Sequence, residues 1–353
     1  TPLIKEIHLG GGTPTFFSPE NLKILIDGIV KHSTLSENAK LGFEGHPNNT
    51  TKEHLKTLYA LSFRRVSFGV QDYNPKIQKA INRIQPFENV EKVHDLAKKI
   101  GYTSISHDLV FGLPHQNIDH ISESIRLTNL LKPDRISLYS YAHVPWIKGV
   151  GQRGFKDEDI PKGDEKRALY ELSKKLLLEN GYHEIGMDHF ALESDSLYDA
   201  YVNKRLHRNF MGYTTNTTSL MIGLGMSSIS DSWGAFAQNV KSVKEYTALV
   251  NENKLPVFRG HFLSEDDLFI RKHILNLMCH FSTDIDAEFR NHHFFKSILK
   301  KLAPLQQDGL IEFSSSQINV TELGRIFIRN ICMCFDIYLD NKLKSQNTFS
   351  KTI

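Results

Sequence analysis

The first two thirds of the chain repeat one pattern of apolar and polar positions. A short run rich in β-branched residues ends at a glycine or a polar residue, and a stretch with helical apolar spacing follows it. The first pair is residues 4–10 and a helix for which Ser18 is a good N-cap and Pro19 a favoured first residue. The apolar residues of that helix fall on one face: Leu22, Leu25, Ile26 and Ile29.

Four more strand candidates follow along the chain, with the sequences KLGFEG, RVSFGVQ, SISHDLVFGLP and DRISLYSYAHVP. A helical pattern comes after each of them. Strands that alternate with helices predict parallel βαβ units, and a series of them predicts either a doubly wound sheet or a barrel, complete or partial. In both folds ligands bind at the C-terminal ends of the strands. Polar residues at those ends are therefore the candidates for a site.

From about Leu263 the pattern changes to a helix, a second helix, a β-hairpin and a final helix, an order that resembles a winged helix. We therefore expect a barrel-like part over residues 1–262 and a mainly helical C-terminal domain over 263–353. Gln306, Gln307 and Asp308 do not give the basic face that nucleic-acid recognition needs. A small helical cap is the better interpretation.

Length and composition limit the number of domains, the class of partner and the cellular compartment. The 353 residues leave room for about two domains of ~150 residues. The net charge of +3 argues against a nucleic-acid partner. The absence of a run of ~18 apolar residues argues against a membrane span. Three cysteines are too few for a disulfide framework, which predicts a reducing, cytoplasmic compartment.

The predicted strand ends carry a set of polar residues that together suit an amino-acid ligand. Arginine binds a carboxylate with two hydrogen bonds, glutamate and backbone carbonyls accept from an ammonium, and aspartate or glutamine can bind ribose hydroxyls. The set predicts an aminoacyl nucleoside site, although a glycine run also suits a tight turn and Asp108 could cap a helix or form a structural ion pair. Its members are Gly10, Gly11, Gly12, Thr13, Glu44, Gln71, Arg83, Asp108, Ala142 and His143.

Several motifs resemble the oxygen-independent coproporphyrinogen III oxidases, which are radical S-adenosylmethionine (SAM) enzymes, and the resemblance covers essentially the whole chain. It implies an α/β fold with a partial, TIM-like (β/α) radical-SAM barrel and a mainly helical, winged-helix-like C-terminal domain. RNFMGYTT and NICMCFD are the more specific motifs, and they are unexpected in the related haem chaperones. The motifs are IHLGGGTPTFFS, RVSFGVQDYN, INRIQ, SHDLVFGLP, GMDHFA, LHRNFMGYTT and RNICMCFD.

The resemblance implies two SAM molecules. Gly11 and Glu44 would contact the first, cleaved molecule, and Ile229 would pack on its adenine. The second molecule would contact Gly12, Thr13, Gln71, Arg83, Asp108 and Ala142. The implied reaction uses a 5′-deoxyadenosyl radical to take hydrogen from a propionate of coproporphyrinogen III. Two rounds release carbon dioxide, pass electrons to an unspecified acceptor and give protoporphyrinogen IX in haem biosynthesis.

One family feature is missing from this sequence. The family carries a C-x3-C-x2-C loop, before the glycine loop, whose thiolates ligate a [4Fe-4S] cluster. Cys279, Cys332 and Cys334 have the wrong spacing, and Cys332 is better interpreted as apolar packing. We therefore expect no metal ligands in this chain, a truncation before the second barrel strand, cluster ligands upstream of Thr1, and an inactive chain when it is alone.

The substrate contacts are the least specified part of the site. His207 and Arg208 are candidates for binding the carboxylates of the tetracarboxylate substrate, while Asp188 and His189 could equally form a buried structural pair. The alternatives to the oxidase are a haem chaperone, a pseudo-enzyme that binds SAM or porphyrin, and a winged-helix nucleic-acid binder. The resemblance favours a monomer.

Overall fold

The structure is a computed structural model that describes residues 1–144 and 154–339. It divides into two compact units after Asp199, and each unit is described here by itself. The boundary expected between residues 262 and 263 falls within the second unit, ahead of helix α9 (Glu265–His280).

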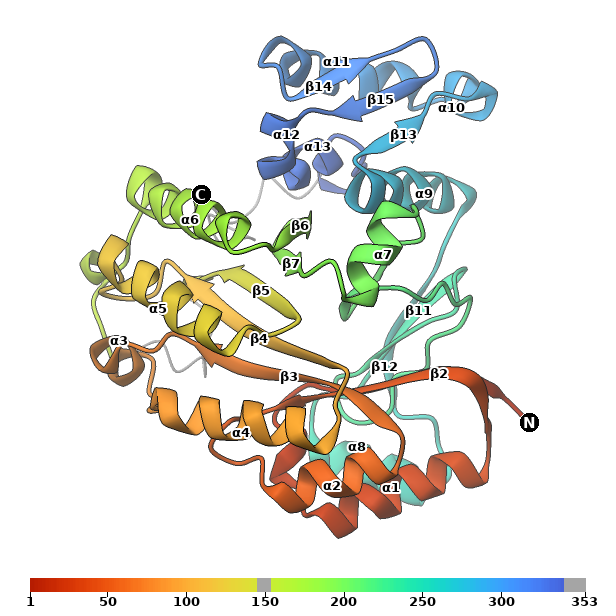
Figure 1. The fold of residues 1–353 in the computed structure, drawn as a ribbon. Helices are drawn as coiled ribbons and strands as arrows, with labels where there is room; N and C mark the ends of the chain where they lie inside the picture. The colour runs from red at the N-terminus through yellow and green to blue at the C-terminus, as the bar shows by residue number, and fades with distance from the viewer. Residues whose placement is uncertain (145–153, 340–353) are drawn as a thin grey trace. The chain divides into compact units, whose positions relative to one another are not determined.

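The first unit is built on a curled sheet of seven strands in the order β1-β2-β3-β4-β5-β7-β6 (Figure 1). The first five strands pair in parallel, and β7 runs antiparallel to both β5 and β6. This arrangement confirms the predicted α/β partial barrel. The strands are β1 (Leu3–Leu9), β2 (Thr34–Gly45), β3 (Phe63–Gln71), β4 (Ser104–Phe111), β5 (Arg135–Ser140), β6 (His183–Gly186) and β7 (His189–Ala191).

Helices connect the parallel strands. Helix α1 begins as the sequence predicts, because the Ser18 side chain accepts a hydrogen bond from the backbone N–H of Asn21. Leu22 and Ile26 are buried, but Leu25 is 45% exposed, so the buried stripe is narrower than the predicted one. The helices are α1 (Pro19–Lys31), α2 (Lys52–Ala60), α3 (Pro75–Ala80), α4 (Phe87–Ile100), α5 (Ile118–Leu131), α6 (Gly163–Glu179) and α7 (Ser196–Val202).

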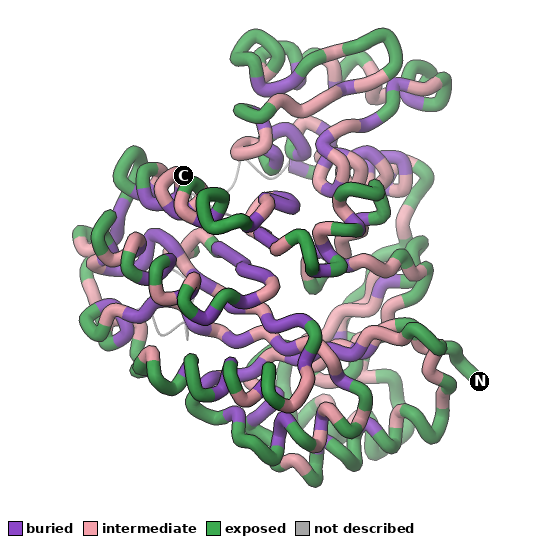
Figure 2. The backbone as a smooth tube through the Cα atoms, in the orientation of Figure 1, coloured by how far each residue is buried: buried purple, intermediate pink, exposed green. Residues whose placement is uncertain are grey.

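Side-chain alternation along the strands separates the core from the site. Phe43 of β2 and Phe68 of β3 are fully buried with Leu55 and Leu58 of α2 in one apolar cluster. Figure 2 shows these buried positions along the strands and the inner sides of the helices. Each such side chain contributes about 1.5–3 kcal/mol by leaving water. Successive side chains of a strand point to opposite faces, so Glu44 points away from this core.

The second unit carries a hairpin, two small antiparallel sheets and most of the remaining helices. Its last part has the predicted order of helix, hairpin and helix. Within residues 1–144 and 154–339, no helix has the length and apolar character that crossing a membrane requires. The elements are β8 (His207–Asn209), β9 (Gly212–Thr214), β10 (Ile229–Asp231), β11 (Ala235–Asn239), α8 (Val243–Asn251), β12 (Val257–Phe262), α9, β13 (Ser282–Asp284), α10 (Ala287–Asn291), α11 (Phe295–Gln307), β14 (Ile311–Phe313), β15 (Gln317–Val320), α12 (Glu322–Ile326) and α13 (Ile328–Met333).

Candidate functional site

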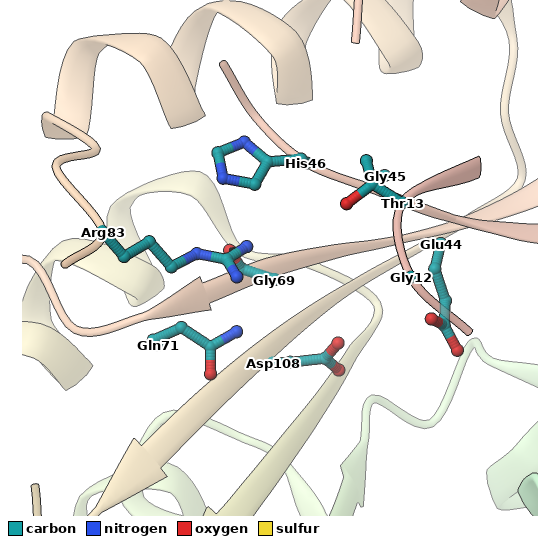
Figure 3. A pocket seen from close by; sticks show the side chains of 9 residues that line it. All are labelled: Gly12, Thr13, Glu44, Gly45, His46, Gly69, Gln71, Arg83 and Asp108. Atoms are coloured by element: carbon teal, nitrogen blue, oxygen red, sulfur yellow. Dashed lines mark hydrogen bonds between the residues drawn. The ribbon is translucent and has the colours of Figure 1, made fainter. Parts of the chain in front are cut away.

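A pocket of about 130 Å³ lies at the C-terminal ends of β2, β3 and β4, beside the glycine loop that follows β1. Most of the polar residues predicted from the strand ends line it, and Gly45, His46 and Gly69 are additions that the sequence did not single out. Figure 3 shows Arg83, His46 and Gln71 on one side and Glu44 with the glycine loop on the other, with Asp108 between them. The lining residues are Gly12, Thr13, Glu44, Gly45, His46, Gly69, Gln71, Arg83 and Asp108.

The register of the sheet brings these residues together. Glu44 of β2 is paired with Ser67 of β3, and Gly69 of β3 is paired with Asp108 of β4. Because the three strands are parallel, their C-terminal ends meet at one edge of the sheet. Two carboxylates from strands that are far apart in sequence therefore face one pocket.

Asp108 is the most strongly perturbed acid of the pocket. Its carboxyl accepts a hydrogen bond of 3.0 Å from the Ser67 hydroxyl. Burial raises the pKa of Asp108 to about 6, with hydrogen bonds from Ser67 and Ser137 opposing the rise and the charge of Glu44 adding to it. The carboxyl is therefore mostly ionised at neutral pH and titrates just below it.

Arg83 supplies the positive charge. Its Nη2 donates a hydrogen bond of 2.8 Å to the Gly69 carbonyl, and its buried Nε has no hydrogen-bond partner among the described residues. Burial lowers the pKa of Arg83, opposed by the charge of Asp108, but an arginine stays protonated. Burial and the Arg83 charge both lower the pKa of His46, which makes this imidazole neutral at pH 7.

Gly69 leaves room for the present approach of Arg83 to the backbone. A Cβ atom there would lie 2.8 Å from Arg83 Nη2 and 2.9 Å from Gln71 Nε2. The strand register shifts between Gly69 and Gln71, and Gln71 adopts a left-handed φ of 69°. Gln85 holds this bulge because its side-chain amide donates to the carbonyls of Gly69 and Val70, both at 3.2 Å.

The glycine loop passes close to Glu44. A Cβ atom at Gly10 would lie 2.8 Å from His8 Nε2 and 2.9 Å from Glu44 Oε1, and these two side-chain atoms are 3.3 Å apart. Gly11 has a φ of 103°, a conformation that only glycine adopts readily. A loop without side chains thus leaves backbone groups exposed beside a carboxylate.

The remaining predicted residues lie outside this pocket. Gly11 does not line it, Ala142 follows β5, and Ile229 begins β10 of the second unit. Arg208 of β8 lies over the Tyr213 ring at 4.7 Å, and its buried Nη1 has no hydrogen-bond partner within the described residues. Burial lowers the pKa of His207, and the positive charge of Arg271 lowers it further. The roles assigned to these residues stay predictions.

The structure also shows the surroundings of Asp188, His189 and two of the three cysteines. Asp188 and His189 form an ion pair of 2.7 Å, with each side chain about 15% exposed. Cys279 and Cys332 are buried, and burial raises the pKa of each thiol to about 12. Without a bound metal both thiols are therefore protonated at pH 7, which agrees with apolar packing.

Comparisons with known proteins agree on one family. A sequence model of the radical SAM superfamily matches residues 1–128. The oxygen-independent coproporphyrinogen III oxidase of Synechocystis is 38% identical over 361 residues, which cover 99% of this chain and 77% of the relative. The Escherichia coli enzyme is also 38% identical, with the same coverage. A solved structure of coproporphyrinogen III oxidase from Escherichia coli, a radical SAM enzyme, superposes with a TM-score of 0.91 and covers 95% of this chain and 78% of that one.

Proposed function

This chain belongs to the family of oxygen-independent coproporphyrinogen III oxidases within the radical SAM superfamily, and from that premise we propose that its strand-end pocket binds the methionyl end of SAM during the oxidative decarboxylation of coproporphyrinogen III. The observation that carries the proposal is the charge pattern of the pocket, in which Arg83 lies across from Glu44 and Asp108. A pocket with one cationic and one anionic side matches an amino acid, which carries both charges.

The groups of the pocket fit the groups of the ligand. The Nε of Arg83, which has no hydrogen-bond partner among the described residues, can donate to the ligand carboxylate. A charge-assisted bond of this kind is about twice as strong as a neutral one. Asp108 and the carbonyls of the glycine loop can accept from the ammonium, and Glu44 adds negative charge on the same side. At about 130 Å³ the pocket is smaller than the ~300–1,000 Å³ of sites for whole drug-sized ligands, so it suits the amino-acid end alone.

We extend the proposal to two SAM molecules, as the resemblance implies. Gly11, Glu44 and Ile229 would contact the cleaved molecule. The second molecule would contact Gly12, Thr13, Gln71, Arg83, Asp108 and Ala142. His207 and Arg208 would bind carboxylates of the porphyrinogen. The Nη1 of Arg208 supports this role, since it has no hydrogen-bond partner in the part of the chain that the structure describes.

The chain's own residues bind and orient the reactants. SAM, together with a reduced [4Fe-4S] cluster, supplies the radical chemistry of this family when bound. Arg83 and Gln71 would fix the methionyl group, while Asp108 holds negative charge beside the ammonium. Cys279, Cys332 and Cys334 do not have the C-x3-C-x2-C spacing of the family's cluster loop, so no step is assigned to them.

Calorimetric titration of SAM into the full chain tests the proposal without requiring turnover. Arg83→Gln removes the cation, and we expect its Kd to rise at least tenfold because a hydrogen bond to a charged group contributes about 1.5–3 kcal/mol. Arg126→Gln is the matched control, since Arg126 is an exposed arginine that pairs with Glu123 at 2.7 Å. An unchanged Kd in a folded Arg83→Gln variant would contradict the proposal.

A further inference from the structure

We propose that Asp266, His292 and His293 form a binding site for one divalent transition-metal ion, with Zn²⁺ as the best match. All three residues belong to the second unit. Asp266 lies in the first turn of α9, and the two histidines follow α10 directly, in the link to α11. The proposal does not depend on the SAM pocket.

The spacing of the three side chains matches metal coordination. One ligand atom from each residue lies within 4.8 Å of the other two. His292 Nε2 is 3.3 Å from Asp266 Oδ1, and His293 Nε2 is 3.5 Å from Asp266 Oδ2. A tetrahedral ion with bonds of about 2.1 Å holds its ligand atoms about 3.4 Å apart. The three side chains are therefore close enough to share one ion once the exposed His293 ring turns toward it.

Ring packing fixes His292, while the exposed His293 side chain can turn toward a shared ion. The His292 ring stacks on Phe269 with centroids 3.7 Å apart and an interplanar angle of 5°. The His293 ring stacks in turn on His292 at 4.6 Å and 21°. His293 must turn out of this stack to aim Nε2 at an ion bound by His292. His292 is already held by Phe269, so little of its side-chain freedom is lost when an ion binds.

Exposure leaves one side of the site open. The His292 side chain is 14% exposed, Asp266 is 36% exposed and His293 is 63% exposed. Three protein ligands with one open side leave a fourth position for water, as in three-ligand zinc sites. Two imidazoles and a carboxylate favour zinc and its neighbours over magnesium or calcium, which prefer oxygen ligands.

The tautomer of His292 must also leave Nε2 unprotonated so that it can bind an ion. The backbone N–H of Phe294 approaches Nδ1 of His292 at 3.4 Å. This is longer than the usual 2.7–3.2 Å range of N–H hydrogen bonds, so it holds the tautomer weakly. Nδ1 can therefore carry the ring proton while Nε2 binds the metal. The ion would then tie the start of α9 to the link between α10 and α11.

Calorimetric titration of Zn²⁺ into the full chain, compared between variants, tests the site. We expect wild type to bind one more equivalent than His293→Gln or Asp266→Asn, or to bind it at least tenfold more tightly. His261→Gln is the control. His261 is a half-exposed histidine of β12 that lies 3.3 Å from Asp267, and Asp267 is in the same turn of α9 as Asp266. The control should bind as wild type does. Equal stoichiometry and Kd in all three variants and in wild type would overturn the proposal.

Cobalt provides a second readout. Co²⁺ bound by this set should give the visible bands of a tetrahedral complex in wild type and in His261→Gln, and not in His293→Gln. Because His293 is largely exposed, its replacement should leave the metal-free Tm unchanged, which separates loss of the site from misfolding. Identical Co²⁺ spectra in wild type and in a folded His293→Gln variant would also overturn the site.

Discussion

His94 of α4 and His107 of β4 hydrogen-bond to each other through His94 Nδ1 and His107 Nε2, 3.1 Å apart, in the buried layer between helix and strand. Burial lowers the pKa of His94 to about 4 and also lowers the pKa of His107, with each affected by nearby positive charge. Both imidazoles are therefore neutral in the folded chain at pH 7.

We predict that this pair makes the fold sensitive to acid. The folded pKa values are depressed, so the unfolded chain takes up protons first as the pH falls below about 6.5. The free energy of unfolding should be greatest above pH 6.5 and should fall between pH 6.5 and 4. His94 alone accounts for about 2 kcal/mol between pH 7 and 5.

Urea unfolding at pH 7 and pH 5 measures this effect. His94→Gln should reduce the difference between the two pH values by at least half of that amount. Burial also lowers the pKa of His273 to about 4. This histidine therefore adds a pH dependence of stability that wild type and His94→Gln share. An identical pH dependence in the variant would refute the assignment to His94.

We predict that SAM affinity rises with pH through the titration of Asp108. The pKa of about 6 leaves this carboxyl largely protonated at pH 5 and largely ionised at pH 7. Only the ionised form attracts the ligand ammonium, so Kd should fall by up to about tenfold over that interval. Asp108→Asn should flatten the profile, whereas Asp119→Asn, at an exposed residue in the first turn of α5, should keep it. A slope that persists in Asp108→Asn would assign the titration to another group.

We predict that Gly69→Ala disrupts the pocket. The new methyl group would lie 2.8 Å from Arg83 Nη2, so the guanidinium must leave the Gly69 carbonyl. SAM affinity should fall at least tenfold, comparable to the loss of a charged hydrogen bond. The matched control is Gly28→Ala in α1, where a Cβ atom meets nothing within 4 Å and should stabilise the helix by about 0.5–1 kcal/mol. Calorimetric titration of SAM into both variants tests this prediction. Full affinity in Gly69→Ala would show that Arg83 binds SAM without its contact to a glycine at position 69.

We predict that the buried ion pair of Arg135 and Asp195 is required for stability. The two groups are 2.7 Å apart, and their side chains are 8% and 1% exposed. Asp195→Asn would leave a buried arginine without its charge partner, which costs about 3–5 kcal/mol. Glu123→Gln, which breaks the exposed pair with Arg126, should cost less than about 1 kcal/mol. Urea midpoints measure the difference, and equal small losses would show that Arg135 finds another partner.

The sequence predicted the parallel strands and most of the pocket because the ends of parallel strands meet at one edge. Glu44, Gln71 and Asp108 follow apolar runs that could be recognised without knowing the register. Helix α4 was not predicted, although Val90, Val93 and Ala97 give it a buried face. That spacing of apolar residues is enough to predict an amphipathic helix here.

Gly69 and His46 were missed for different reasons. The importance of Gly69 depends on a strand bulge and on how closely Arg83 approaches, and neither leaves a mark in the local sequence. His46 follows directly after β2, so its position alone could have included it. Ala142 was named from its place at a strand end and Ile229 from the resemblance alone, and the pocket includes neither.

The Gly69 carbonyl accepts from both Arg83 and Gln85, and a carbonyl oxygen has two lone pairs. Side chains from the segment after α3 therefore occupy the acceptor that a neighbouring strand would otherwise use. One backbone oxygen therefore fixes both the end of β3 and the position of the pocket's cation. A substitution at Arg83 or Gln85 would change the strand end and the pocket together.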